Sequence, residues 1–438
     1  MNRVEATRVA ALYIPFALAA IAGLLQTDRH RQLPACLLSV LWTFSSLLVL
    51  QCLNLWAGWW SFRDSDIVFR GTPLEFYLGW VALWGLLPQL AFPRLPIAAS
   101  SAIMGSVDLI AMPACSAVIR LGPRWLVGEV VALLLVLLPA LAIARWTRED
   151  THLRERVILQ MIVAGLTFLF LLPEAIFAMR PGAGWAHLVS TRGWIRQLAL
   201  QAIALLALPG ISAVLEFAER GGGSPIPYDP PKRLVTSGLY RYLSNPMQIS
   251  CTLTMCAWAI LLGNAWMGVA AAVALVYGVG IAAWDEEEDM ERRFGPPWRQ
   301  YRGVVRNWMP RWRPYHAGAP ARLYIAETCG PCSELRAWIA ARAPIGLELV
   351  PAESFPAGPI QRLRYDPADG SGDVDGVRAV ARALEHLNLG WALAGAALRL
   401  PLVWRFVQVL TDAAGLGPRT LTAGARVPAC CETSNGRR

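Results

Sequence analysis

Long apolar runs constrain the fold of this chain more than any other feature of its sequence. A helix needs about 20 mostly apolar residues to cross a bilayer. Stretches that meet this requirement cover residues 9–25, 34–60, 76–92, 126–144, 157–179 and 194–217. A weaker stretch, 97–119, is interrupted by Asp108, and a closely spaced pair covers 247–262 and 265–284. Together these runs predict an all-α polytopic membrane protein with about nine transmembrane helices.

The composition agrees with a membrane protein. Of the 438 residues, 55% are hydrophobic and only 16% are charged, whereas a soluble domain carries about 25% charged residues. A soluble protein with buried core helices would not need so many long apolar runs. The net charge of +9 does not indicate nucleic-acid binding, because no basic cluster is interleaved with aromatic residues. We therefore expect the lipid bilayer as a partner and no nucleic acid.

Basic residues between the spans predict the orientation of the chain. Cytoplasmic loops carry an excess of lysine and arginine. Such residues gather in the later loops at Arg145, Arg148, Arg154, Arg156, Lys232, Arg233, Arg241 and the stretch 292–313. With nine crossings, the N-terminus would lie outside and the C-terminus in the cytosol. The composition, rich in alanine, arginine and leucine, is typical of a bacterial inner-membrane protein.

The polar motifs divide the chain into four predicted regions. Residues 1–150 hold about five spans and little chemistry, and 151–315 hold the other spans with most of the polar motifs. Prolines near residue 315 mark a linker into a soluble domain, 316–427, and 428–438 form a flexible tail. We therefore expect the chemistry in the second and third regions.

A glycine- and proline-rich segment follows the span 194–217. The glycines and prolines between residues 221 and 231 oppose a regular helix. Irregular backbone beside a bilayer must be satisfied by water, protein or a ligand. This segment is therefore either an ordinary interfacial loop or part of a binding site.

A run of five acidic residues, Asp285 to Asp289, directly follows the span 265–284. It is either a solvated helix end, where like charges repel one another, or a site for a cationic ligand, which carboxylates and aromatic faces attract. The run alone does not decide between these interpretations.

Taken together, the two segments resemble a known family. The first contains Leu234-Val235-Thr236-Ser237-Gly238-Leu239-Tyr240 and then Ser244-Asn245-Pro246, and the second contains Glu286-Glu287-x-x-Met290-x-x-x-Phe294-Gly295 followed by Trp298 and Tyr301. Across a hairpin of the same size, this pattern resembles the isoprenylcysteine carboxyl methyltransferase and phospholipid methyltransferase family. The resemblance covers roughly residues 155–312.

The resemblance implies a membrane-embedded methyltransferase that uses S-adenosylmethionine and has no Rossmann domain. The chain indeed lacks the glycine-rich dinucleotide fingerprint. By the family pattern, Glu286 would receive the ammonium group of the cofactor, and the lipophilic acceptor would enter from the bilayer. The implied cofactor-binding residues are Lys232, Leu234, Val235, Tyr240, Asn245, Pro246, Met247, Gln248, Glu286 and Glu287. No catalytic residue is assigned.

Three positions depart from the family pattern. Ser244 replaces an arginine and Gln248 an aromatic residue, whereas Asn245, at the usual histidine position, is a common bacterial variant. Ala282 stands where prenylcysteine enzymes carry an arginine that holds the substrate carboxylate. These departures argue against a prenylcysteine acceptor. We expect a carboxylate or an amine of a lipid or of a lipidated molecule.

The region after residue 316 carries a CxxC motif. Residues 321–326 predict a buried strand, Cys329-Gly330-Pro331-Cys332 opens a helix over 333–343, and 347–350 predict a second strand. A thiol at a helix N-terminus favours the thiolate. A zinc site needs a second ligand pair, and the adjacent Cys430 and Cys431 are not spaced as one. We therefore expect a redox pair and no metal.

This region resembles thioredoxin-like thiol-disulfide oxidoreductases with an Asp-Cys-Cys signature. Besides the CxxC motif, the match includes Arg364-Tyr365-Asp366 and Asp375-Gly376-Val377-Arg378-Ala379. It implies a small α/β thioredoxin-like domain and a thiol-disulfide partner. Two alternatives to a methyltransferase remain open: a membrane redox protein with a non-catalytic methyltransferase-like scaffold, and a membrane anchor or lipid-binding protein without turnover.

Overall fold

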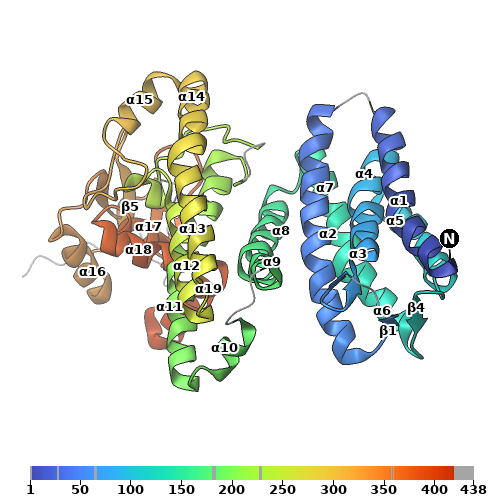
Figure 1. The fold of residues 1–438 in the computed structure, drawn as a ribbon. Coiled ribbons are helices and arrows are strands. Elements are labelled where there is room, and N and C mark those ends of the chain that lie inside the picture. Colours follow the sequence, from blue (N-terminus) through green and yellow to red (C-terminus); the bar gives the residue numbers. More distant parts are fainter. Residues whose placement is uncertain are drawn as a thin grey trace, which may run out of the picture. The chain divides into compact units, whose positions relative to one another are not determined.

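The computed structural model describes residues 2–26, 29–63, 67–179, 184–225, 229–356, 358 and 360–418, and for residues 29–31, 277 and 281–286 it describes the backbone alone. Helices dominate the fold (Figure 1). The chain forms two compact units that alternate along the sequence. Unit 1 contains Met1–Gln197, Gly222–Lys232 and Met255–Ala271, and unit 2 contains Leu198–Gly221, Arg233–Thr254 and Ala272–Arg438. Each unit is described by itself, and the four predicted regions stay predictions.

Six of the described helical segments are long and apolar enough to cross a membrane. They are Arg3–Leu24, Gln32–Ala57, Ile97–Ala114, Trp125–Glu149, Leu153–Met179 and Gly193–Gly221. The predicted integral membrane protein is thus supported, but the predicted number of nine crossings is not confirmed. The helices of the predicted pair are short, at 17 residues for Pro246–Leu262 and 13 for Ala265–Tyr277. The run 76–92 is helical over three elements and is not among the six.

Unit 1 is a helical bundle with a tryptophan-rich core. Its helical elements are α1 (Arg3–Leu24), α2 (Arg29–Ala57), α3 (Leu74–Trp80), η1 (Val81–Leu86), α4 (Leu87–Ala91), α5 (Ile97–Ala114), α6 (Trp125–Ala132), η2 (Leu133–Leu137), α7 (Leu138–Glu149), α8 (Leu153–Leu166), η3 (Thr167–Leu171), α9 (Leu172–Met179) and α10 (Trp185–Ser190). Trp59, Trp60 and Trp84 are buried among apolar side chains of these helices. Gly79 is required where α1 meets α3, because a Cβ there would lie 2.1 Å from the carbonyl oxygen of Ala11.

Unit 1 also contains two short antiparallel strand pairs. Strand β1 (Trp60–Phe62) pairs with β4 (Ile119–Leu121), and β2 (Val68–Phe69) pairs with β3 (Thr72–Pro73). The first pair joins the segment after α2 to the segment after α5. Asn54 supports this junction, because its side-chain amide donates to the carbonyl oxygen of Trp60 at 3.0 Å and its carbonyl oxygen accepts from the Trp60 N–H at 3.0 Å.

The helices that carry the two segments of the family pattern fall mainly in unit 2. They are α11 (Gly193–Glu216), η4 (Phe217–Gly221), the 3-10 turn η5 (Gly238–Arg241), α12 (Pro246–Leu262), α13 (Ala265–Tyr277), η6 (Gly278–Ala282), α14 (Ala283–Phe294) and α15 (Pro296–Arg302). Helices α12 and α13 each have residues in both units. The acidic run lies in α14, which continues the helical path of α13 through η6 (Figure 1).

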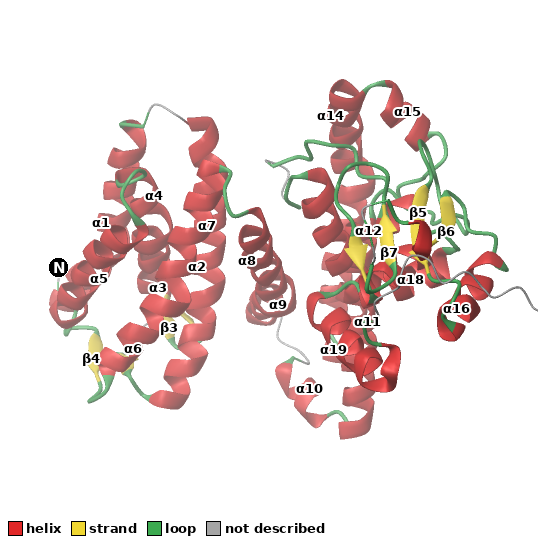
Figure 2. Cartoon of the chain, turned by 180° about the vertical axis from the view of Figure 1, so that it is seen from behind, coloured by secondary structure: helices red, strands yellow, loops and turns green. Residues whose placement is uncertain are grey.

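The C-terminal part of unit 2 contains a four-stranded mixed sheet (Figure 2). Its elements are β5 (Ala321–Ile325), α16 (Gly330–Ala340), β6 (Leu347–Pro351), η7 (Ala352–Ser354), β7 (Arg364–Asp366), β8 (Val374–Asp375), α17 (Val377–Leu384), α18 (Leu389–Leu398), α19 (Pro401–Thr411) and η8 (Asp412–Leu416). The strand order is β6-β5-β7-β8, with β5 and β6 parallel and the other pairs antiparallel. Both predicted strands are confirmed, and the predicted helix begins three residues earlier, at Gly330.

The helices that follow this sheet in the sequence, α17 and α18, pack on the loop that carries the first motif. Leu239 and Tyr242 are buried against Ala392 and Ala396 of α18. The Tyr242 hydroxyl donates to the carbonyl oxygen of Glu385 at 3.0 Å. The C-terminal region is therefore packed into unit 2, although its sequence predicts a soluble domain behind a linker.

Candidate functional site

The loop that leads from α11 to α12 is fixed by a tight turn at its centre. Gly238 has a φ of +60°, and a Cβ there would lie 3.2 Å from the side chain of Glu216. Glycine satisfies both the backbone conformation and the close approach. This turn starts η5 and directs Tyr240 into the core, where it is almost fully buried.

Three of the predicted cofactor-binding residues lie together in this loop region. Val235, Tyr240 and Met247 pack with Ala213 and Phe217 of the α11–η4 segment. The Tyr240 hydroxyl donates to the carbonyl oxygen of Ala213 at 3.3 Å. Because this cluster is apolar and well packed, it positions the start of α12 rather than offering polar groups.

The two sequence motifs meet in unit 2. The Tyr301 hydroxyl donates to the carbonyl oxygen of Tyr240 at 2.8 Å. Leu234 packs on the aromatic cluster of α14 and α15, formed by Met290, Phe294, Trp298, Tyr301, Val305 and Tyr315. The structure therefore places the first motif directly against the second.

Polar atoms without partners mark the beginning of α12. Pro246 is the first residue of this helix, so Asn245 directly precedes it and Gln248 lies in its first turn. Asn245 Nδ2, Gln248 Oε1 and Trp308 Nε1 are buried and have no hydrogen-bond partner within the described part of the chain. Such groups cost roughly 1–3 kcal/mol each when they stay unsatisfied. Their accumulation favours a polar ligand at this position.

Gly278 in η6 lies against two of these side chains. A Cβ at this position would lie 3.3 Å from Gln248 Oε1 and 3.5 Å from Trp308 Cζ2. The side chains of Gln248 and Trp308 therefore converge on the glycine backbone between α13 and α14. Donor and acceptor atoms beside an aromatic ring fit the amino-acid and adenosine parts of S-adenosylmethionine, which offer ionised, hydrogen-bonding and ring surfaces.

The remaining predicted residues have separate surroundings. Glu287 is exposed and pairs with Arg302, with 3.2 Å between Oε2 and Nη2. Glu286 lies in α14, but its side chain is outside the described residues. Lys232 belongs to unit 1, where its Nζ lies 2.6 Å from Asp150 Oδ2.

A buried ion-pair cluster beside the loop was not predicted from the sequence. Glu216, at the end of α11, is fully buried and is bonded by Ser237, Arg382 and Arg399. Glu385 pairs with both arginines, at 3.3 Å from Arg382 Nη1 and 2.7 Å from Arg399 Nε. Burial lowers the pKa of Arg382, but the carboxylates of Glu216 and Glu385 outweigh it and leave the pKa raised. The arginines therefore stay charged and balance the acids.

The thiol pair lines a pocket of about 260 Å³ in the C-terminal part of unit 2. Cys329 is the N-cap of α16, and Cys332 lies in its first turn. The other lining residues come from the segment that precedes β7, from α17 and from the α19–η8 segment. They include Arg362, Val377, Gln408 and Leu416. Cys430 and Cys431 lie outside the described residues. In the described ranges, no group of three potential ligands is placed to hold a metal ion.

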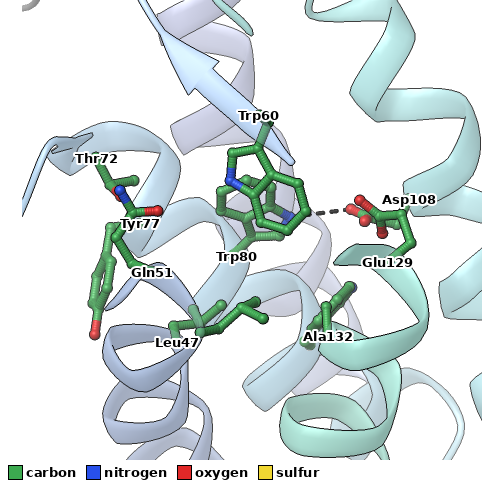
Figure 3. A pocket seen from close by; sticks show the side chains of 11 residues that line it. Leu47, Gln51, Trp60, Thr72, Tyr77, Trp80, Asp108, Glu129 and Ala132 are labelled. Carbon is green, nitrogen blue, oxygen red and sulfur yellow. Dashed lines mark hydrogen bonds between the residues drawn. The ribbon is translucent and has the colours of Figure 1, made fainter. Parts of the chain in front are cut away.

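Acidic residues inside the unit 1 helices are paired. Asp108 of α5 accepts from Trp80 Nε1 at 3.0 Å, and its carboxyl group lines the same small cavity as that of Glu129 of α6 (Figure 3). Glu174 of α9 accepts from Arg70 and from Trp185. Contacts within the bundle thus account for Asp108 and Glu174, two carboxyl groups that lie inside apolar runs.

Comparisons with known proteins identify one segment of the chain. Residues 210–296 match the family model described as phospholipid methyltransferase. This segment contains the end of α11, the loop, α12, α13 and the acidic run, so the match supports a methyltransferase in a membrane protein. It includes Asn245, Gln248 and Gly278, and it also contains Glu216.

One further relative is a short bacterial protein. An uncharacterized protein of Haemophilus influenzae is 37% identical to this chain over 65 residues, which is 14% of this chain and the whole of that protein. The chain therefore belongs to the same family as this protein, whose name states no function. No solved structure matches the chain.

Proposed function

We propose that this chain is an integral-membrane methyltransferase that uses S-adenosylmethionine and acts on a lipophilic acceptor. The observation that carries the proposal is the set of buried, unpartnered polar atoms of Asn245, Gln248 and Trp308 within or beside the segment that matches the phospholipid methyltransferase family. A packed interior normally satisfies such atoms, so their presence supports a ligand at this position.

Some of the proposed cofactor residues could bind the cofactor directly, and others hold the surrounding elements in place. Asn245 Nδ2 and Trp308 Nε1 can donate hydrogen bonds, and Gln248 Oε1 can accept one. By resemblance to the family, Glu286 would receive the ammonium group. The cofactor supplies an activated methyl group on a sulfonium centre. Val235, Tyr240 and Met247 hold the start of α12 in place, and Glu287 is held by Arg302 on the exposed side of α14.

The proposed acceptor is a lipid or a lipidated molecule with a carboxylate or an amine. A carboxylate is already ionised at neutral pH, so alignment alone would serve, and alignment contributes up to about 7–11 kcal/mol in favourable cases. An amine would first lose a proton. Entry from the bilayer suits an acceptor of either kind, because α11 and the helical pair that follows it are apolar.

Location and orientation follow from the same proposal. The six candidate spans place the chain in a membrane, and the arginine-rich later loops support a cytosolic C-terminus. The alanine-, arginine- and leucine-rich composition supports a bacterial inner membrane. In this orientation the site would face the compartment that contains S-adenosylmethionine.

A second candidate function rests on the thiol pair. Its support is the parallel β5-α16-β6 unit with the antiparallel β7 and β8 in the order β6-β5-β7-β8, which is the order expected of a thioredoxin-like core. Cys329 at the N-terminus of α16 is placed where the helix dipole favours a thiolate. The region would then exchange a disulfide with a protein or small-molecule partner, in addition to methyl transfer or instead of it.

The test is transfer of labelled methyl from S-adenosylmethionine in membranes that contain the full chain, counted separately in lipid and protein. We expect label in one fraction and its loss in Glu286→Ala. Glu288→Ala is the matched control, because Glu288 is exposed and pairs only with residues of its own helix among the described contacts. Label that persists in Glu286→Ala, or no label with the intact chain, argues against the methyltransferase. A Cys329→Ala/Cys332→Ala variant separates the second function.

A further inference from the structure

Helix α19 has its polar and apolar faces reversed relative to a helix on the surface of a water-soluble domain. Gln408 and Asp412, the residue that follows the helix, face the protein: Gln408 Oε1 accepts from the Val377 N–H at 3.0 Å, and Asp412 pairs with Arg362 at 2.5 and 2.8 Å. Apart from the exposed Arg405, the outer face is apolar, with Leu402 80%, Phe406 65% and Val409 65% exposed.

The spacing of the exposed residues makes this face continuous. Leu402, Phe406, Val409 and Leu410 recur at intervals of three and four residues, so they lie along one side of the helix. A surface helix in water places polar residues on this side. The reversed pattern is stable only where the surroundings of the outer face are apolar.

The start of α19 is fixed beside a candidate membrane span. Arg399, at the bend between α18 and α19, donates to Ser212 Oγ at 3.3 Å and pairs with Glu216. Both partners belong to the last turns of the span Gly193–Gly221. The outer face of α19 therefore begins at one end of a helix whose own exposed side chains, such as Leu205, suit lipid.

The geometry excludes a full crossing by α19. Its 11 residues extend about 16 Å at 1.5 Å per residue, and the hydrocarbon core is about 30 Å thick. Together, α18 and α19 are apolar enough for a span, but they meet at 87°. Arg405 on the outer side lies 5.4 Å from the Trp404 ring, an arrangement that suits the boundary between lipid and water.

We propose that α19 lies in the membrane interface, with Leu402, Phe406 and Val409 inserted among the lipid chains. The occupant of this surface is the bilayer itself. The C-terminal part of unit 2 is then held against the membrane at the end of α11, and α19 separates the thiol pocket from lipid, because Gln408, Thr411 and Leu416 also line that pocket. The proposal does not depend on methyltransferase activity.

The test is photo-crosslinking of the full chain in membranes that contain a radiolabelled phospholipid. The photoreactive residue p-benzoylphenylalanine replaces Leu402 or Phe406 in separate chains. Leu205, exposed on α11, is the lipid-facing reference, and Glu334, exposed on α16, is the water-facing control. All four positions are on the surface, so the replacements need not disturb the core.

The interfacial helix predicts lipid labelling at residues 402 and 406 within about twofold of that at 205 and roughly tenfold above that at 334. Labelling at both positions no higher than at 334 overturns the proposal. Crosslinks from both positions to protein instead of lipid also overturn it, because the face is then covered by another chain.

Discussion

Arg382 Nη1 donates to both carboxylate oxygens of Glu216, at 2.8 Å each, and both side chains are buried. The two residues are 166 positions apart in the sequence. Arg399 contacts the same carboxylate from the bend after α18. The last turn of α11, within the segment that matches the methyltransferase family, is therefore attached to two C-terminal helices by a buried, balanced set of charges.

Glu216→Gln tests whether this cluster holds unit 2 together. The substitution keeps the volume but leaves Arg382 and Arg399 with one carboxylate fewer in a buried environment. Removing one member of a buried pair costs about 3–5 kcal/mol, so we expect a clear fall in the melting temperature of the purified chain. Glu288→Gln, at an exposed pair, should leave it nearly unchanged. Equal, small effects of both would contradict the role of Glu216.

His386 predicts a dependence of stability on pH. The side chain is fully buried between Ile345, whose carbonyl oxygen is 2.8 Å from Nδ1, and the Tyr365 hydroxyl, 2.9 Å from Nε2. Burial, with positive charge at Arg241, holds the pKa of His386 well below its usual value. Below pH about 6.5, His386 becomes protonated in the unfolded chain but stays neutral in the folded chain. The free energy of unfolding therefore falls by up to about 1.4 kcal/mol per pH unit as the pH is lowered.

The measurement is thermal unfolding between pH 7.5 and 5.5 for the intact chain and for His386→Gln. The variant cannot take up the proton, so its stability should depend less on pH across this range. A pH dependence as steep as that of the intact chain would show that other groups cause it.

Asp108 and Glu129 predict different effects of two substitutions in unit 1. Both side chains are buried and line the same small cavity (Figure 3), and two carboxyl groups this close share a proton rather than both ionise. Glu129→Gln supplies a donor in place of the shared proton, so we expect little loss of stability. Glu129→Ala removes that partner of Asp108, which costs roughly 1–3 kcal/mol. Melting temperatures of the two variants in detergent test this, and a glutamine variant as unstable as the alanine variant would contradict the shared proton.

The long helices could be predicted from the sequence because lipid selects for apolar runs that are visible residue by residue. Even Ile97–Ala114, interrupted by Asp108, forms as a long helix, since Trp80 and Glu129 satisfy the carboxyl group. The number of membrane crossings could not be predicted from the sequence, because apolar runs such as 76–92 also form shorter helices inside a bundle.

The local elements of the candidate site could also be predicted. Turn residues placed the loop before α12, and the CxxC motif placed the start of α16 to within three residues. The partners could not be predicted: Glu216 is bonded by residues 166 and 183 positions away, and no local pattern marks such pairs. The unsatisfied atoms of Asn245 and Gln248 are likewise visible only once the packing around α12 is known.

Cofactor binding to the purified full chain tests the central claim most directly. Titration calorimetry would compare S-adenosylmethionine binding to the intact chain with binding to Asn245→Ala/Gln248→Ala, with Ser244→Ala as a neighbouring control whose hydroxyl is already bonded to Asn307. The account predicts binding by the intact chain and a loss of about tenfold or more in affinity for the double variant, with only a small loss of melting temperature, because Asn245 Nδ2 and Gln248 Oε1 have no hydrogen-bond partner among the described residues. Equal binding by the double variant, or no binding by the intact chain, would contradict a cofactor site at the start of α12.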